Sequence, residues 1–206
     1  MISKVFLIIL ISYLLGSMNS SIIISKLIHN KDIRTVGSKN AGFTNALRNL
    51  SKLSATFTFL LDFFKGVFAI YISKYIINNN MDYNYLLYIS MFMCMIGHMY
   101  PCFFKFKGGK GVLVTWGSTL LINWHIFIFT IIVFLIVLLM TRTVSIASIF
   151  AALSFPAVTL FITHFNYSND NMFFCTLVTS IISFVIILKH KSNISRLISG
   201  TENKIK

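Results

Sequence analysis

A short stretch of the chain, FKFKGGKG at residues 104–111, places three lysines and three glycines between two apolar segments. Glycines leave the backbone N–H groups of a loop open to a ligand, and lysines add positive charge beside them. A helix is expected to begin near Val112, so its positive N-terminal end would face the same place. The stretch therefore predicts a site for a phosphate-sized anion. Its members are Lys107, Gly108, Gly109, Lys110 and Gly111.

A second loop of similar chemistry precedes it in the chain, with the sequence DIRTVGSKNAGFTNALRNL at residues 32–50. Gly37 and Gly42 open its backbone, and Ser38, Thr44 and Asn45 bring short hydroxyl and amide groups. Arg48 follows Thr44 by one helical turn, so both side chains are expected on one side of a helix. Guanidinium groups bind phosphate well. This loop predicts a second anion site, although a basic loop that is merely solvated would share its charge.

Several kinds of catalytic site are disfavoured by spacing. The glycine-rich stretch is no nucleotide-binding loop of the Walker type, because Lys110 is followed by glycine, and no GxGxxG motif occurs. No serine lies in a G-x-S-x-G turn, and no histidine is followed by aspartate five positions later. The polar loops contain only Asp32 and Glu202 as carboxylates, which are far apart in sequence, so we expect no metal site. Cations, amides, hydroxyls and a histidine remain as the chemical groups available.

The composition is that of an integral membrane protein. Of the 206 residues, 56% are hydrophobic and 11% are charged, whereas soluble domains have about 25% charged residues. The net charge of +13 would suggest a nucleic-acid partner in a soluble chain, but here the charge belongs to loops beside a membrane. We expect no nucleic acid. The three cysteines show no CxxC spacing and are expected to be packed and reduced.

Apolar segments of about 20 residues, enough to cross a bilayer, lie near residues 4–25, 53–76, 84–103, 146–165 and 171–188. The uncharged stretch 111–141 is too long for one untilted helix, and a polar notch at 123–125 divides it. A helical hairpin that turns at the notch gives seven transmembrane helices and places all but three of the 18 Lys and Arg residues inside. We predict an all-α, polytopic membrane protein with one domain, residues 1–206, an outside N-terminus and a cytoplasmic C-terminus.

Two further groups are singled out within the predicted spans. Asp62 and Lys65 lie one helical turn apart and are expected to form an ion pair that orients the loops. His98 precedes the glycine-rich stretch at the end of a helix, where it either orients this stretch or contacts a substrate.

The motifs resemble, in order from about residue 15 to 202, those of the acyl-phosphate-dependent glycerol-3-phosphate acyltransferases of bacterial membranes. They are Leu15-Gly16-Ser17, DIR-x-VGS-x-N-x-G-x-TN-x-x-R from Asp32, LDFFKG at 61–66, GHMYP with FKGGKGV from Gly97, VSIAS at 144–148, and H-x-x-NI-x-RL-x-x-G-x-E from His190. That family also has seven spans and an inner C-terminus, in agreement with the topology deduced from charge.

The resemblance implies transfer of a fatty acyl group from acyl phosphate to the 1-hydroxyl of sn-glycerol 3-phosphate. The products would be lysophosphatidate and phosphate, in the first acylation step of phospholipid synthesis. It implies no cofactor, and the expected partners are the two substrates, membrane lipids and the enzyme that makes acyl phosphate. The expected location is the bacterial inner membrane, with the active site on the cytoplasmic side.

The resemblance also assigns roles to individual residues. It implies that the catalytic residues are Ser38, Arg48, Lys107, His190 and Asn193. It implies that the substrate-binding residues are Gly37, Asn40, Thr44, Asn45, Gly108, Gly109, Lys110, Gly111 and Ser145. No dedicated general base is expected, since the phosphate of the substrate is thought to assist deprotonation.

Three positions depart from the pattern of the family. Lys39 stands where a glycine is usual, Phe43 where an alanine is usual, and Asn19 where a proline is usual. A positive φ at Lys39 would cost on the order of 1 kcal/mol.

Two other functions remain open at this stage. A small transporter of organic phosphates would also use cationic sites, although transporters usually bind their substrate near the membrane midplane. A scaffold that docks lipid-synthesis enzymes would use the basic inner face.

Overall fold

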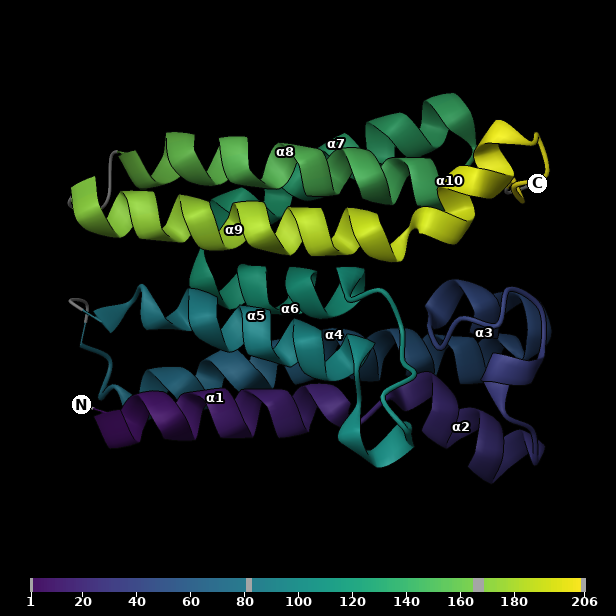
Figure 1. Cartoon of the computed structure of the whole chain (residues 1–206), viewed down its shortest axis with the longest axis horizontal. Coiled ribbons are helices and arrows are strands. Elements are labelled where there is room, and N and C mark those ends of the chain that lie inside the picture. The colour runs from purple at the N-terminus through teal and green to yellow at the C-terminus, as the bar shows by residue number, and fades with distance from the viewer. Residues whose placement is uncertain (1, 81–82, 165–168, 205–206) are drawn as a thin grey trace. The chain divides into compact units, whose positions relative to one another are not determined.

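The computed structural model of the chain describes residues 2–80, 83–164 and 169–204. Regular structure in these residues is helical, as predicted (Figure 1). The sequence predicts one domain, and the helices within it pack as two compact units, Met1–Ile122 and Asn123–Lys206.

The first unit is organised around α4 and α5, on which α1 and α6 pack. Its helices are α1 (Ile2–Ser17), α2 (Ser20–His29), α3 (Phe43–Asn49), α4 (Lys52–Ile76), α5 (Leu86–Met99) and α6 (Val112–Ile122), with 3-10 turns η1 (Ile33–Thr35) and η3 (Cys102–Phe104). Glycines allow the backbones to approach closely. A Cβ on Gly16 of α1 would clash with the backbone of Cys94 in α5, and one on Gly117 of α6 with that of Phe63 in α4. The rigid packing fixes the helix ends from which the polar loops emerge.

The predicted ion pair of Asp62 and Lys65 is confirmed, with Nζ and Oδ1 2.8 Å apart and both side chains buried. Lys65 also donates to the carbonyls of Gly16 and Met18 at the end of α1, and its Nζ lies 2.9 Å from Nδ1 of His98. A charge buried among apolar helices needs such partners. The pair therefore ties α4 to the ends of α1 and α5, where the polar loops begin.

The second unit is a group of helices in which α8 packs against both α7 and α9. They are α7 (Trp124–Thr141), α8 (Val144–His164), α9 (Asn169–Lys189) and α10 (Lys191–Ile198). The predicted break at the polar notch is confirmed, because α6 ends at Ile122 and the side chain of Asn123 accepts from the N–H groups of His125 and Ile126 at the start of α7. The break follows from N-capping by asparagine.

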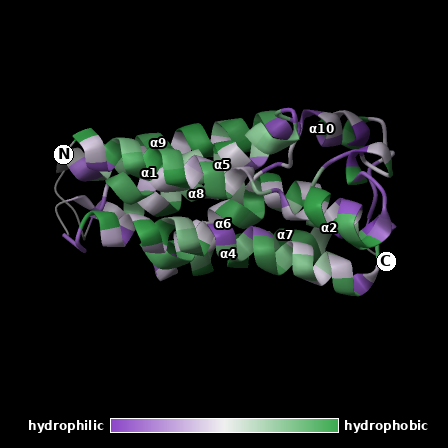
Figure 2. Cartoon of the chain, turned by 90° about the horizontal axis from the view of Figure 1, so that it is seen from below, coloured by the Kyte–Doolittle hydropathy of each residue, from purple (hydrophilic) through white to green (hydrophobic). Residues whose placement is uncertain are grey.

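Six helical segments of the described residues are long and apolar enough to cross a membrane. They are Ile2–His29, Lys52–Ile76, Leu86–Phe104, Trp124–Thr141, Val144–His164 and Asn171–Lys189. Figure 2 shows apolar residues along the long helices and hydrophilic residues at their ends and in the connections. The remaining apolar helix, α6, has 11 residues and is about 16 Å long, against roughly 30 Å of hydrocarbon. The count of seven and the orientation of the termini therefore stay predictions.

Two predicted segments differ in detail from the structure. The predicted span 4–25 is interrupted, since α1 ends at Ser17 and α2 begins at Ser20. Asn19 causes the interruption, because its side chain caps the new helix by accepting from Ile22 N. The last residue of the predicted span 146–165 lies outside the described residues.

Candidate active site

Asn45 is the centre of the loop between α2 and α3. Its Nδ2 group faces the carbonyl oxygens of Ile33, Val36 and Asn40 at 3.0, 3.1 and 3.1 Å, and its Oδ1 accepts from the N–H of Ser38. The side chain is buried. These contacts show that Asn45 holds the loop together, and its predicted part in substrate binding stays a prediction.

Gly37 must be glycine for two reasons. Its φ is +56°, and a Cβ there would clash with the side chains of Asn45 and Asn49. A left-handed conformation with a close neighbour leaves room for no side chain. Gly37 thus lets the chain turn tightly around Asn45, which brings Ser38 to the start of α3.

Two of the three departures from the family pattern have a local explanation, and the third, Lys39, has none in the structure. Lys39 does adopt a positive φ of 58°. Phe43 packs its ring edge-on against Phe59 of α4, with centroids 5.3 Å apart. Asn19 caps α2 and also donates from Nδ2 to the carbonyl of Ala41 at 3.3 Å. Two of the replacements therefore add contacts that attach this loop to the helices.

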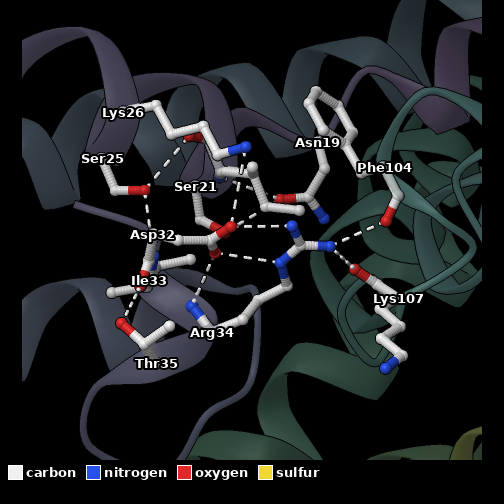
Figure 3. A network of polar contacts seen from close by, with 11 residues as sticks. Asn19, Ser21, Ser25, Lys26, Asp32, Ile33, Arg34, Thr35, Phe104 and Lys107 are labelled. Carbon is white, nitrogen blue, oxygen red and sulfur yellow. Dashed lines mark hydrogen bonds and ion pairs between the residues drawn. The ribbon is translucent and has the colours of Figure 1, made fainter. Parts of the chain in front are cut away.

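Arg34 connects the first loop to the glycine-rich stretch (Figure 3). Its Nε and Nη2 donate to Oδ1 and Oδ2 of Asp32 at 2.9 and 2.7 Å. Its Nη1 donates to the carbonyls of Phe104 and Lys107 at 2.7 and 3.1 Å. The hydrogen bonds from Arg34 hold the pKa of Asp32 at about 2, and the carboxylate in turn raises the pKa of Arg34. Both groups are charged at any physiological pH.

The glycine-rich stretch is tighter than predicted. The N–H groups of Gly108 and Gly109 donate to the carbonyls of Met99 and His98 at 3.1 Å each, so the prediction that these two amides are open to an anion is wrong. They serve instead to fold the stretch back onto the end of α5. A Cβ on Gly109 would clash with Nε2 of His98 and with the carbonyl of Ala41 in the first loop. The two predicted anion loops are therefore in direct contact, and His98 lies between them.

Other predicted residues present polar groups outward. Ser38 and Lys107 are exposed and Thr44 is half-buried. Among the described residues, the Ser38 and Thr44 hydroxyls and the Lys107 ammonium have no hydrogen-bond partner. Arg48 is exposed on α3, in the same helix as Thr44, as predicted. Such donors are suited to a ligand that supplies several acceptor oxygens.

The remaining predicted site residues of the first unit lie beside these groups. Asn40 accepts through its carbonyl from Asn45 and Gly42. Lys110 is half-buried, and Gly111 precedes α6, where its carbonyl accepts from the N–H of Thr115. The predicted helix start at Val112 is confirmed.

Predicted residues of the second unit gather around Glu202. Its Oε1 accepts from Ser145 Oγ at 2.9 Å and from Asn193 Nδ2 at 2.7 Å, and its Oε2 accepts from Arg196 Nε at 2.7 Å. Burial alone would raise the pKa of Glu202, but these hydrogen bonds lower it below its ordinary value. Ser145 and Asn193, which are distant in sequence, are thereby brought together.

His190 lies at the junction of α9 and α10 and is buried. Its Nδ1 is 2.8 Å from the carbonyl of Ile186. Because a carbonyl can only accept, this contact places a proton on Nδ1. The ring is thus held in a defined orientation.

Comparison with known proteins gives the family. The model of the family described as "Glycerol-3-phosphate acyltransferase" matches residues 6–200. The chain belongs to this family. It is similar to the glycerol-3-phosphate acyltransferase of Prochlorococcus marinus (strain MIT 9301), with 37% identity over 97% of this chain and 96% of that one. It is also similar to the glycerol-3-phosphate acyltransferase of Finegoldia magna, with 38% sequence identity over 95% of this chain and 93% of that one.

Two solved structures of PlsY, an integral membrane glycerol 3-phosphate acyltransferase, are similar to the chain along its length. The glycerol 3-phosphate form has a TM-score of 0.85 and 34% identity, covering 98% of this chain and 96% of that one. The lysophosphatidic acid form has a TM-score of 0.82 and 32% identity, covering 98% and 95%. The predicted family and the assignment to phospholipid synthesis are confirmed.

The residues that hold these loops in place were not predicted from the sequence. No role was predicted for Arg34, Asn19 or Asn49. Asp32 and Arg34 nevertheless stand two positions apart in the DIR sequence that begins at Asp32. A carboxylate and a guanidinium at that spacing do not face each other on a helix. Asp32 and Arg34 can face each other because Asp32 lies just before the 3-10 turn η1, where its side chain caps the turn by accepting from Arg34 N.

Proposed function

We propose that the chain transfers a fatty acyl group from acyl phosphate to the 1-hydroxyl of glycerol 3-phosphate, which gives lysophosphatidate and phosphate. Membership of the acyltransferase family makes it a membrane acyltransferase; the donor, the product and the side of the membrane are the proposal. We place the reaction at the cytoplasmic surface of a bacterial inner membrane, where a lipid-soluble donor and a water-soluble acceptor can meet.

The observation that carries the proposal is the contact between the two polar loops of the first unit. Ser38 and Thr44 on one loop and Lys107 on the other offer side-chain donors that have no partner within the described part of the chain. Both substrates carry a phosphate group, and both products contain one. A surface that combines hydroxyl and ammonium donors suits these groups. In the second unit, we assign Ser145, His190 and Asn193 to the pocket for glycerol phosphate.

In the proposed reaction, the 1-oxygen of glycerol 3-phosphate attacks the acyl carbon. A new C–O ester bond forms while the bond between the acyl carbon and the phosphate oxygen breaks, and the phosphate leaves with the electron pair. Negative charge grows on the carbonyl oxygen and on the leaving phosphate, and fixed cationic donors such as Lys107 and Arg48 stabilise it.

The hydroxyl proton needs an acceptor, and the polar-loop carboxylates are poorly suited. A general base works best with a pKa near the working pH, whereas the pKa of Asp32 is about 2 and that of Glu202 is lowered. Each is already occupied by an arginine. We therefore assign the proton to the phosphate group of glycerol 3-phosphate, whose second pKa lies much closer to neutrality.

The test is an assay of the purified protein with radiolabelled glycerol 3-phosphate and acyl phosphate, acyl-CoA or acyl carrier protein as donor. We expect labelled lysophosphatidate with acyl phosphate alone. Lys107→Ala and Arg48→Ala should each lower turnover by about 10²- to 10³-fold. Lys105→Ala is the matched control from the same stretch and should retain turnover. Product from acyl-CoA but none from acyl phosphate would overturn the proposed donor.

Family membership favours the enzyme over the transporter and the scaffold. The same preparation in sealed vesicles separates the three functions. Uptake of labelled glycerol 3-phosphate without product would support transport instead, and neither uptake nor product would leave only a scaffold.

A further inference from the structure

We propose that Arg34 is a positioning residue of the active site, which acts by clamping the segment Phe104–Lys107 so that the Lys107 ammonium faces the substrate phosphate. The inference rests on the proposed function, because it assigns Arg34 to the reaction through Lys107. It goes beyond that proposal by naming the device that sets the lysine.

The guanidinium of Arg34 donates hydrogen bonds to both loops. One edge forms the paired bonds to the carboxylate of Asp32, and Nη1 reaches two main-chain carbonyls of the other loop. Figure 3 shows the Lys107 side chain pointing away from Arg34 while its carbonyl points toward it. Arg34 therefore holds the backbone of Lys107 and leaves its ammonium for another partner.

The clamped segment has a backbone that needs an external restraint. Lys105 and Phe106 are consecutive non-glycine residues with φ of 57° and 56°. Left-handed conformations at such residues are strained and persist only where the surroundings impose them. Within the segment, Phe106 N donates to Pro101 O at 3.0 Å and Lys107 N to Phe104 O at a longer 3.3 Å. The bonds from Arg34 lie at the two ends of this strained pair, at Phe104 and Lys107.

Asp32 fixes the guanidinium in turn. The Asp32 and Arg34 side chains are 23% and 19% exposed, so the pair is partly shielded from water and from screening by salt. The planar fork can satisfy the carboxylate and the two carbonyls together, whereas the ammonium of lysine has no such fixed geometry. Lys26, whose Nζ is 3.6 Å from Asp32 and whose side chain is 50% exposed, touches the same carboxylate without reaching the glycine-rich stretch. It provides a matched control.

The first arm of the test measures amide hydrogen exchange of the full chain in detergent, without any substrate. Arg34→Ala and Arg34→Lys should speed exchange at Phe106 and Lys107. Exchange at Gly108 and Gly109, which are held by the end of α5, should stay near the wild-type rate and serve as the internal reference. Lys26→Ala should change neither. Equal exchange in all of these proteins would overturn the inference.

The second arm is a double-variant cycle in the acyl transfer assay. Arg34→Ala should lower kcat/KM by about tenfold or more in the wild-type background, and by less than about twofold when Lys107 is already alanine, because a residue that acts through another loses its effect with it. Additive losses would overturn the inference, since a merely structural defect adds to any other loss. Arg34→Lys, which keeps the charge, provides the same comparison with Lys107→Ala if Arg34→Ala does not fold.

The two arms separate the inference from the proposed function. An inactive wild type would refute the proposed function, while the exchange arm would still decide whether Arg34 restrains the segment. An active wild type with unchanged exchange in the Arg34 variants would refute the clamp alone.

Discussion

Replacing Asn45 by aspartate is the most direct test of how the first loop is built. The substitution keeps the shape of the side chain but turns the Nδ2 donor into an oxygen that faces the carbonyls of Ile33, Val36 and Asn40. The two N–H bonds of Nδ2 can serve two of these carbonyls fully. Each carbonyl keeps a backbone donor, from Val36 to Ile33, from Lys39 to Val36 and from Gly42 to Asn40. The cost is therefore the loss of about two hydrogen bonds, about 1–3 kcal/mol in the free energy of unfolding.

For a chain of this size, the loss corresponds to a fall in melting temperature of roughly 2–12 °C. Thermal unfolding in detergent at neutral pH measures it. The matched control is Asn49→Asp, because Asn49 is exposed and its side chain donates, among the described residues, only to the backbone and side chain of Asn45. It should cost about 1 kcal/mol or less.

The pH dependence of Asn45→Asp provides a second check. Burial and the facing carbonyls disfavour the charged carboxylate, so its pKa in the folded state should rise above the ordinary value for aspartate. The folded state then binds the proton more readily than the unfolded state. The destabilisation relative to wild type is therefore complete above the raised pKa and shrinks as the pH falls through it. A variant that melts like wild type at neutral pH, or that loses further stability relative to wild type on acidification, would refute this reasoning.

Two other perturbations follow from the backbone and from the charged tail. Lys39 and Lys105 are exposed lysines with φ of 58° and 57°. Lys39→Gly and Lys105→Gly should each raise the free energy of unfolding by about 0–1 kcal/mol, because glycine relieves the strain but costs conformational entropy. A clear fall in melting temperature in both variants would contradict the left-handed conformation. Glu202 has a lowered pKa, so it stabilises the fold above the ordinary pKa of glutamate and this contribution disappears as the pH falls through the lowered value. Glu202→Gln should flatten the acid limb of a plot of melting temperature against pH, and an unchanged limb would show that other groups control it.

The sequence was sufficient for the positions of the long helices, but not for the hydrogen bonds of the loops. Hydrophobic length and the Asn123 notch predicted the long helices and the break before α7 because these depend on local composition. The state of the Gly108 and Gly109 amides depends on where the end of α5 lies, which is a tertiary property. Glycine indicated a close approach in this stretch, yet the partners were the chain's own carbonyls and His98.

The same limit explains why Asn45 was assigned to substrate and Arg34 to nothing. A family motif marks a residue that matters, but it does not say whether the side chain contacts the ligand or the loop. For Asn45 the distinction needs its five hydrogen-bond partners, which come from residues 33–49. The Ser38 and Thr44 hydroxyls and the Lys107 ammonium differ from the Asn45 side chain in having no partner among the described residues. A direct role in substrate binding remains a prediction for all four residues.

The use of acidic residues links the fold to the proposed chemistry. The three carboxylates whose side chains the structure describes each pair with a base, Asp32 with Arg34, Asp62 with Lys65 and Glu202 with Arg196. A carboxylate placed among the exposed cations would compete with phosphate for them and weaken substrate binding. The negative charge of each of these acids is therefore offset locally by its own cation. The excess positive charge of the chain is then available for anionic substrates and lipid headgroups, as the proposed reaction between two phosphate compounds at a membrane surface requires.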